Sequence, residues 1–269
     1  MDSIKQALEL AKAAGSNYHQ ATASFGFTPG IRVGQNTPQV REVRLNPAHL
    51  ESKRIVAYGA AGEHGRYYDM LRTQVLQEMD KKNWQFLAIT SPTAECGKTV
   101  TACNLAMSIA RLPERSVLLV DLDLRKPMVA NYLGLEPSSG IVGVLEERVS
   151  LSEAVVNASV GPASFMVLPG SVSHASSEWM ASQTMNTVLQ AIKRDFRSRT
   201  VIFDLPPMLL GDDVISILPR IDAALLVGSI GTTTVADIKE CQKHLQRTPV
   251  VRVVVNKATE LPKSYYGYY

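Results

Sequence analysis

Short apolar runs alternate with amphipathic segments along most of the chain. Residues 86–90 form an apolar run typical of a buried strand, and from Gly97 onward apolar residues recur at helical spacing. Apolar runs predict strands at 86–90, 116–120, 165–168, 200–203, 223–227 and 250–255. Helical spacing predicts helices at 50–57, 67–79, 98–111, 127–133, 177–197, 212–218 and 233–245. Because buried strands that alternate with helices form parallel sheets covered on both faces, we expect an α/β fold with a mostly parallel sheet.

The first part of the chain has a different pattern. Residues 2–14 place apolar side chains on one helical face, whereas residues 16–47 carry Gly, Pro, Asn, Gln and Thr without periodicity. So short a helix is marginal alone, so it needs a surface to pack on, either its own domain or another protein. We therefore expect a short helix and flexible linker over residues 1–49, an α/β domain over residues 50–260 and a separate tail over residues 261–269.

Composition and charge narrow the choice only slightly. The chain has 269 residues and a net charge of +3, which is too small to indicate nucleic-acid binding. Its three cysteines, Cys96, Cys103 and Cys241, fit neither a disulfide framework nor a metal-site spacing. No apolar run is long enough to cross a bilayer, and the N-terminus lacks the apolar core of a signal peptide. A reducing, cytoplasmic location is the expectation.

A phosphate-binding loop is predicted where the strand at 86–90 gives way to the next helix. Gly97-Lys98-Thr99 would offer backbone N–H groups and the positive end of a helix dipole to a polyphosphate. Lys98 can then reach the outer phosphates, and the Thr99 hydroxyl can bind Mg²⁺. The predicted fold is therefore that of a P-loop NTPase. The predicted nucleotide-binding residues are Thr93, Ala94, Glu95, Cys96, Gly97, Lys98, Thr99, Val100 and Asn256.

This loop departs from the usual G-x-x-x-x-G-K-[ST] pattern. Pro92 stands at the position of the first glycine, and the four residues that follow it contain no glycine. Glu95 also adds a negative charge next to the expected phosphates. Cys96 could become redox-sensitive beside Lys98, but a small loop residue without that role is the favoured interpretation.

Two further strands end in acids. Asp121 and Asp123 follow the strand at 116–120, and Asp204 follows the strand at 200–203. In parallel sheets such positions meet beside the phosphate loop, where they supply oxygen ligands for Mg²⁺. Asp204 fits the Walker B role, and residues two apart on an extended segment share a face, so Asp121 and Asp123 could both approach the metal and the nucleophile. Arg125 either pairs with phosphate or neutralises the acids. The predicted metal ligands are Thr99, Asp123 and Asp204, and the predicted catalytic residues are Lys98, Asp121 and Asp123.

The C-terminus carries four tyrosines in its last five residues: Tyr265, Tyr266, Tyr268 and Tyr269. A free chain end does not build a core, so we expect these side chains to be presented to solvent as phosphoacceptors. Each phosphate would add about two negative charges. The alternative is a tail that packs on a neighbouring molecule.

Together these features resemble the bacterial tyrosine kinases (BY-kinases), P-loop enzymes of exopolysaccharide and capsule synthesis that phosphorylate their own tyrosine-rich C-termini. The similarity covers about residues 66–269. Its motifs are Ser91-Pro92 with Gly97-Lys98-Thr99, the segments at 117–127 and 201–207, the LRTQV segment at 71–75, the Ser177-Glu178 stretch and the tyrosine tail. The resemblance implies that Lys98 and Thr99 bind ATP and Mg²⁺, that the three aspartates surround the metal, and that Asp121 is the base for an incoming tyrosine.

The resemblance also implies partners. The tail would enter the site of a neighbouring copy, and such head-to-tail contacts close into rings. The family's Glu-x-x-Arg-x-x-Arg contact pattern reads Arg66, Asp69 and Arg72 here, so the first two signs are exchanged. A separate membrane chain-length regulator would activate the kinase at the inner face of the membrane, and a cognate tyrosine phosphatase would reverse its action.

Two other classes remain open. A partition or septum-positioning ATPase would share the fold, but such proteins carry an additional lysine early in the phosphate loop, and this chain has none between Pro92 and Gly97. A scaffold with impaired catalysis would account for Glu95 and the missing loop glycines.

Overall fold

The computed structural model describes residues 40–59, 63–196, 199–246 and 248–258. The chain divides into two units, residues 1–38 and 39–269, and all described residues belong to the second. The predicted helix at 2–14, most of the predicted linker and the tyrosine tail lie outside the described residues.

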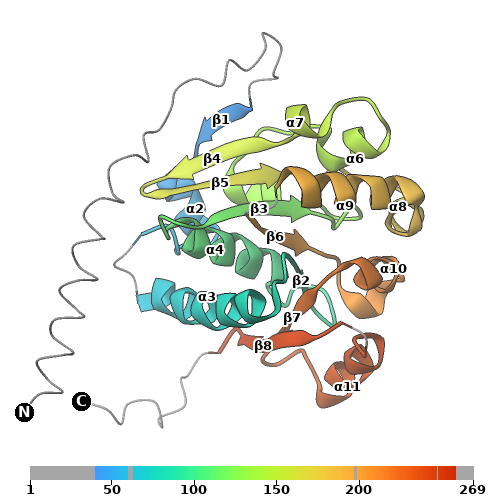
Figure 1. The fold of residues 1–269 in the computed structure, drawn as a ribbon. Helices are drawn as coiled ribbons and strands as arrows, with labels where there is room; N and C mark the ends of the chain where they lie inside the picture. The colour runs from blue at the N-terminus through green and yellow to red at the C-terminus, as the bar shows by residue number, and fades with distance from the viewer. Residues whose placement is uncertain (1–39, 60–62, 197–198, 247, 259–269) are drawn as a thin grey trace, which may run out of the picture. The chain divides into compact units, whose positions relative to one another are not determined.

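An eight-stranded sheet forms the centre of this unit, with the order β1-β4-β5-β3-β6-β2-β7-β8. Figure 1 shows β1 and β8 at opposite edges. The strands are β1 (Arg41–Arg44), β2 (Phe86–Thr90), β3 (Ser116–Asp121), β4 (Val156–Val160), β5 (Ala163–Leu168), β6 (Arg199–Asp204), β7 (Ala223–Ser229) and β8 (Val250–Asn256). Every neighbouring pair is parallel except β4 and β5. The predicted mostly parallel sheet is confirmed.

Helices cover both faces of the sheet, because the central strands are apolar on both sides. In β3, Val117 and Leu119 belong to one apolar cluster, and Leu118 and Val120 belong to the other. The first cluster includes residues of α2 (Pro47–Ser52), α3 (Glu63–Lys82), α4 (Lys98–Ala110) and α5 (Val129–Leu133). The second includes residues of α6 (Gly140–Leu145), α7 (Leu151–Ala154), α8 (Ser176–Ala181), α9 (Gln183–Asp195), α10 (Asp213–Ile217) and α11 (Val235–His244). Two short 3₁₀ turns, η1 (Met208–Leu210) and η2 (Leu218–Arg220), flank α10. In the part of the chain that the structure describes, no helix is long and apolar enough to span a bilayer.

The structure corrects three predicted boundaries and adds elements that were not predicted, among them α6 and α7. The predicted linker extends to residue 47, but β1 at Arg41–Arg44 pairs with β4 and therefore belongs to the sheet. The helix expected at 50–57 instead spans Pro47–Ser52, because Asn46 caps its start and the chain turns at Lys53. The helix expected at 177–197 is two helices, since Ser182 is extended and caps α9 by accepting a hydrogen bond from Met185 N. Strand β4 was not predicted.

Candidate active site

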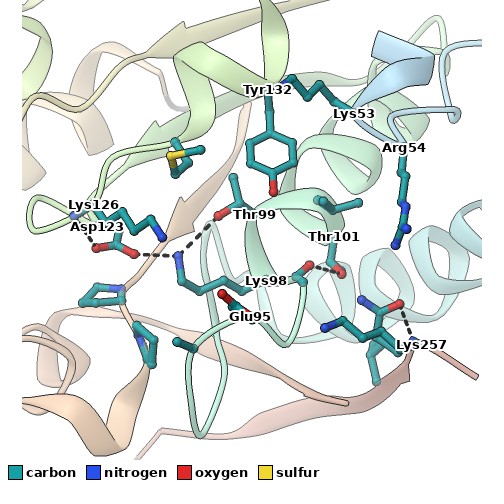
Figure 2. Close-up of a pocket in the computed structure, with 18 of the residues that line it drawn as sticks. Lys53, Arg54, Glu95, Lys98, Thr99, Thr101, Asp123, Lys126, Tyr132 and Lys257 are labelled. Atoms are coloured by element: carbon teal, nitrogen blue, oxygen red, sulfur yellow. Dashed lines mark hydrogen bonds and ion pairs between the residues drawn. The ribbon is translucent and has the colours of Figure 1, made fainter. Parts of the chain in front are cut away.

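The phosphate loop and the two acid-bearing strands lie side by side. Strand β2, which leads into the loop, pairs with β6, and β6 pairs with β3. Asp121 and Asp204 are direct neighbours in the β3–β6 register. A cavity of about 1280 Å³ opens at this edge of the sheet, and Lys98, Thr99 and Asp123 line it (Figure 2). The phosphate loop and Asp123 therefore lie together at the carboxyl ends of the strands, as the sequence predicts.

The phosphate loop turns through backbone conformations that favour glycine. Gly97 has φ +92° and precedes the first residue of α4, so its conformation is one that glycine adopts without strain. A Cβ at this position would lie 2.1 Å from Asn256 Nδ2, which donates a hydrogen bond of 2.9 Å to Cys96 O. Glu95 has φ +61°, so a side chain occupies the left-handed region at a cost of about 1 kcal/mol. Glu95 therefore holds a backbone conformation that glycine would adopt without strain.

Lys98 is held by the acids of the site. Its Nζ lies 2.7 Å from Asp123 Oδ2 and 3.6 Å from Asp204 Oδ1, and Figure 2 shows it directed toward Asp123 and Thr99. Burial alone lowers the pKa of Lys98, but the charges of Asp204 and Asp123 outweigh burial and leave it above its ordinary value. Lys98 is therefore positively charged in the pocket. Its ammonium group can exchange its carboxylate partners for a phosphate when a nucleotide binds.

Asp204 and Thr99 form the deepest part of the site. Thr99 Oγ1 donates a hydrogen bond of 2.6 Å to Asp204 Oδ2, while the buried Asp204 Oδ1 has no hydrogen-bond partner among the described residues. Burial raises the pKa of Asp204, and the charge of Lys98 with the Thr99 hydrogen bond offsets only part of that rise. A carboxylate oxygen that accepts no hydrogen bond from any residue that the structure describes, beside a threonine hydroxyl, fits a Mg²⁺ ion, which prefers oxygen ligands.

Protein side chains alone do not complete such a metal site. Within the described residues, no three His, Cys, Asp or Glu side chains converge closely enough to hold an ion. Mg²⁺ commonly takes one or two carboxylates and completes its shell with phosphate and water. The residue set thus fits a metal that arrives with a polyphosphate.

Asp121 lies differently from the prediction. Its side chain is fully buried and does not line the pocket. Its two oxygens accept hydrogen bonds from Asp123 N at 3.2 Å and Val129 N at 2.9 Å. Burial and then the charge of Asp204 raise the pKa of Asp121 to about 8. The two aspartates therefore do not share a face toward the pocket: β3 ends at Asp121, and Asp123 begins the turn that follows, which a hydrogen bond from Lys126 N to Asp123 O closes.

The other predicted nucleotide-binding residues divide by position. Ala94, Glu95, Gly97, Val100 and Asn256 line the pocket. Thr93 and Cys96 do not, and the Cys96 thiol is buried 3.6 Å from Thr233 Oγ1.

Arg125 lines the same pocket and pairs with Asp213 at 2.8 Å. Arg125 thus neutralises an acid, which is one of the two roles considered for it. The acid is Asp213 at the start of α10, not one of the strand-end aspartates.

Several pocket residues had no local sequence signal. Lys53 and Arg54 follow α2, Tyr132 lies on α5, and Lys257 follows β8. These segments are distant in sequence from the phosphate loop, so only the folded sheet brings them to it (Figure 2). No motif in the sequence marks them.

The exchanged charges on α3 are used within the chain. Asp69 accepts hydrogen bonds from Arg111 at 3.0 Å, from Arg72 at 3.2 Å and from Ser108 Oγ at 2.5 Å. Arg66 is exposed. Asp69 and Arg72 therefore tie α3 to α4, and Arg66 is the one of these three that faces solvent.

A glycine-capped loop between strand and helix, with a lysine and strand-end aspartates around it, defines a P-loop nucleotide-binding protein. The chain belongs to the CobQ/CobB/MinD/ParA nucleotide binding domain family, whose pattern matches residues 87–264.

Proteins of similar sequence and structure include tyrosine kinases, as the motifs predict. The putative tyrosine-protein kinase EpsB of Ralstonia nicotianae is 32% identical over 200 residues, which cover 74% of this chain and 26% of EpsB. The tyrosine-protein kinase CpsD of Streptococcus pneumoniae is 29% identical, covering 71% of this chain and 83% of CpsD. The kinase domain of Escherichia coli tyrosine kinase ETK is 26% identical with a TM-score of 0.63, covering 74% of this chain and 78% of that domain. The resemblance to the bacterial tyrosine kinases is confirmed, while this chain spans about a quarter of EpsB.

Proposed function

We propose that this protein is an ATP-dependent protein tyrosine kinase that phosphorylates the tyrosine cluster at the C-terminus of a second copy of itself. The observation that carries the proposal is the contact of Lys98 with both Asp123 and Asp204, and of Thr99 with Asp204, at the base of a pocket that Lys98, Thr99 and Asp123 line. The relatives named as tyrosine kinases support it, and the tail offers four acceptors, Tyr265, Tyr266, Tyr268 and Tyr269.

The proposed reaction transfers the γ-phosphoryl group of ATP to a tyrosine hydroxyl. The phenol oxygen forms a bond to the γ-phosphorus of ATP, the bond from that phosphorus to the β–γ bridging oxygen breaks, and ADP leaves. The phenol proton passes to a base or to water. Such transfers need positioning and charge neutralisation more than covalent chemistry by the protein.

Each residue has a role in this scheme. Lys98 leaves Asp123 and Asp204 to neutralise the outer phosphates, and backbone N–H groups at the start of α4 hold them. Mg²⁺, when bound, neutralises charge on the phosphates, and Thr99, Asp204 and Asp123 are the residues that would hold it. Release of Lys98 frees the pocket-facing Asp123 to accept the proton of the incoming phenol.

For Asp121, predicted from the resemblance as the base, the buried position favours a positioning role instead. Its two backbone hydrogen bonds fix the turn that carries Asp123. The base role of Asp121 stays a prediction that its variant can test.

The biological setting is also part of the proposal. From the resemblance to the bacterial tyrosine kinases we infer a role in exopolysaccharide or capsule synthesis, with action at the inner face of the membrane through a separate chain-length regulator. The copies assemble head-to-tail, in an arrangement that can close into a ring. A cognate tyrosine phosphatase removes the phosphates. Because Asp69 and Arg72 are used within the chain, Arg66 is the member of that three-residue charge pattern that is left to contact a neighbouring copy.

A partition-type ATPase switch is the second candidate, since the family pattern covers that class as well. The two are separated by incubating the purified full chain with ATP labelled on its γ-phosphate and Mg²⁺. The kinase predicts label on tyrosine in the full chain and none in a Lys98→Ala variant. Steady release of inorganic phosphate without phosphotyrosine favours the ATPase switch.

A third candidate, the scaffold with impaired catalysis, predicts no nucleotide binding at all. A ligand that binds the folded state raises its melting temperature. ATP with Mg²⁺ should therefore raise the melting temperature of the full chain, and no change would favour the scaffold.

A further inference from the structure

The pocket extends well beyond the phosphate loop. Its volume of about 1280 Å³ exceeds the roughly 300–1,000 Å³ typical of small-molecule sites. Lys98 and Asp123 lie on one side of the start of α4, whereas Arg54 and Lys257 lie on the other, and Lys53 runs toward Tyr132 (Figure 2). We call Lys53, Arg54 and Lys257 the cationic wall.

In the part of the chain that the structure describes, the charges of the cationic wall have no acidic partner. Among the described residues, no hydrogen bond or ion pair joins the side chain of Lys53, Arg54 or Lys257 to another group. The nearby acid Glu51 accepts a hydrogen bond of 2.6 Å from Tyr58 Oη instead. By contrast, the cation of the phosphate loop is neutralised by its own acids. The wall therefore presents positive charge to whatever enters this side of the pocket.

Two residues of the cationic wall occupy strained backbone positions. Arg54 has φ +61° and Lys257 has φ +59°, in the left-handed region that disfavours side chains. Arg54 ends α2 in a turn closed by hydrogen bonds from Arg54 N to Glu51 O and from Ile55 N to Leu50 O. Glycine is the usual residue there. A strained non-glycine residue that lines a pocket indicates that its side chain serves a function.

The tyrosine cluster creates a need for such charges. Tyr265, Tyr266, Tyr268 and Tyr269 lie within five residues, so after one transfer every remaining acceptor has a phosphate at most four residues away. Each phosphate carries about two negative charges, which are repelled by the phosphates of bound ATP. Later transfers are therefore progressively disfavoured unless cations near the acceptor neutralise the tail.

We propose that the cationic wall binds phosphotyrosine in a partly phosphorylated tail of a second copy, so that the first transfer favours the next. This inference rests on the proposed kinase function and names a second ligand for the same pocket. The Arg54 guanidinium can bind phosphate through two parallel hydrogen bonds, and the lysines add charge. Tyr67 and Tyr132, which line the same pocket, offer aromatic surface to the phenyl ring.

The test uses the full chain with its four tail tyrosines changed to phenylalanine, so that its own tail does not compete as phosphopeptide. Two labelled peptides of residues 259–269 are titrated, one unmodified and one phosphorylated at Tyr269, in the presence of Mg²⁺ and a non-hydrolysable ATP analogue. The phosphopeptide should bind about fivefold more tightly, the upper range for a partly exposed ion pair.

Variants at Arg54 assign this preference to the wall. Arg54→Gly relieves the backbone strain and should stay folded, yet it should lose most of the preference for the phosphopeptide, whereas Arg54→Lys keeps the charge but not the paired hydrogen bonds and should retain a larger part of it. Glu147→Gly is the matched control, because Glu147 has φ +56° outside the pocket. Its preference should equal that of the parent.

Three results would overturn the inference. The first is equal affinity of the parent for both peptides. The second is an Arg54→Gly variant with the same phosphopeptide preference as the parent. The third is an Arg54→Gly variant whose affinity for the ATP analogue falls by the same factor as its affinity for the phosphopeptide. The last result would assign the wall to the nucleotide. If the full chain transfers phosphate to tyrosine but shows no preference for the phosphopeptide, this inference is wrong and the proposed kinase function stands. If it prefers the phosphopeptide but transfers no phosphate, the kinase function is wrong and the cationic wall is supported as a phosphotyrosine site.

Discussion

Substituting Gly97 by alanine tests the link between the phosphate loop and the last strand. The added methyl group meets two separate costs. The left-handed backbone at φ +92° costs a side chain about 1 kcal/mol. The new Cβ would also lie 2.1 Å from Asn256 Nδ2, so the amide must move and give up its hydrogen bond to Cys96 O, worth about 1 kcal/mol. We expect Gly97→Ala to lower the free energy of unfolding by about 2 kcal/mol in total.

A second glycine separates these costs. Gly231 has φ +84°, but a Cβ there would have no atom within 4 Å, so Gly231→Ala should lose only the conformational part, about 1 kcal/mol. Urea unfolding of both variants measures the difference, and unchanged slopes show that stability alone has changed. In an Asn256→Ala background, Gly97→Ala should cost no more than Gly231→Ala. Equal losses for the two single variants would show that Asn256 does not press on the loop and would refute this reasoning.

Two further substitutions test the acids around the pocket. Asp121→Asn replaces an acceptor that faces Val129 N and should lower the free energy of unfolding by about 1–2 kcal/mol. Tyrosine transfer by this variant should fall less than about tenfold, and a loss above about a hundredfold with unchanged stability would restore Asp121 as the base. Arg125→Ala removes the partner of the buried Asp213 and should cost about 1 kcal/mol at pH 7, allowing for the half-exposed arginine. Burial opposes the charge of Asp213, but Arg125 helps to hold its pKa below the ordinary 3.8, so the stability that the pair provides is present above pH 3.8 and is lost as pH falls further. Unfolding measured from pH 7 to pH 3 should show the variant and parent converge at the acidic end; a constant gap would contradict this.

The sheet was predictable where burial is complete. The run at 223–227 is apolar at every position, and the run at 86–90 at every position but Thr90, because both faces of each strand are covered; both runs therefore stand out in the sequence. Strand β1 has the sequence REVR and is mostly exposed at the sheet edge, so it carries no such pattern. In β4, buried valines and alanine alternate with polar residues, which gives a strand pattern that is too short to separate from the loop around it.

The site was predictable as far as local sequence determines it. Glycine, lysine and threonine at a strand-to-helix junction define a phosphate loop through backbone geometry alone. The orientation of Asp121 was not predictable, because it depends on where β3 ends and on the amide of Val129, which the following turn brings back. The approach of Asn256 to Gly97 and the placement of the cationic wall depend on strand order, which no short motif encodes.

A mixture of two full-length variants tests the central claim most directly. One copy keeps Lys98 but has phenylalanine in place of its four tail tyrosines; the other keeps the tyrosines but carries Lys98→Ala. The two are incubated with ATP and Mg²⁺, and phosphate is mapped by mass spectrometry on the peptide of residues 259–269. The proposed kinase predicts phosphate on the tyrosines of the Lys98→Ala copy in the mixture and none when that copy is incubated alone. Phosphate confined to serine, or equal labelling with and without the copy that keeps Lys98, would contradict it.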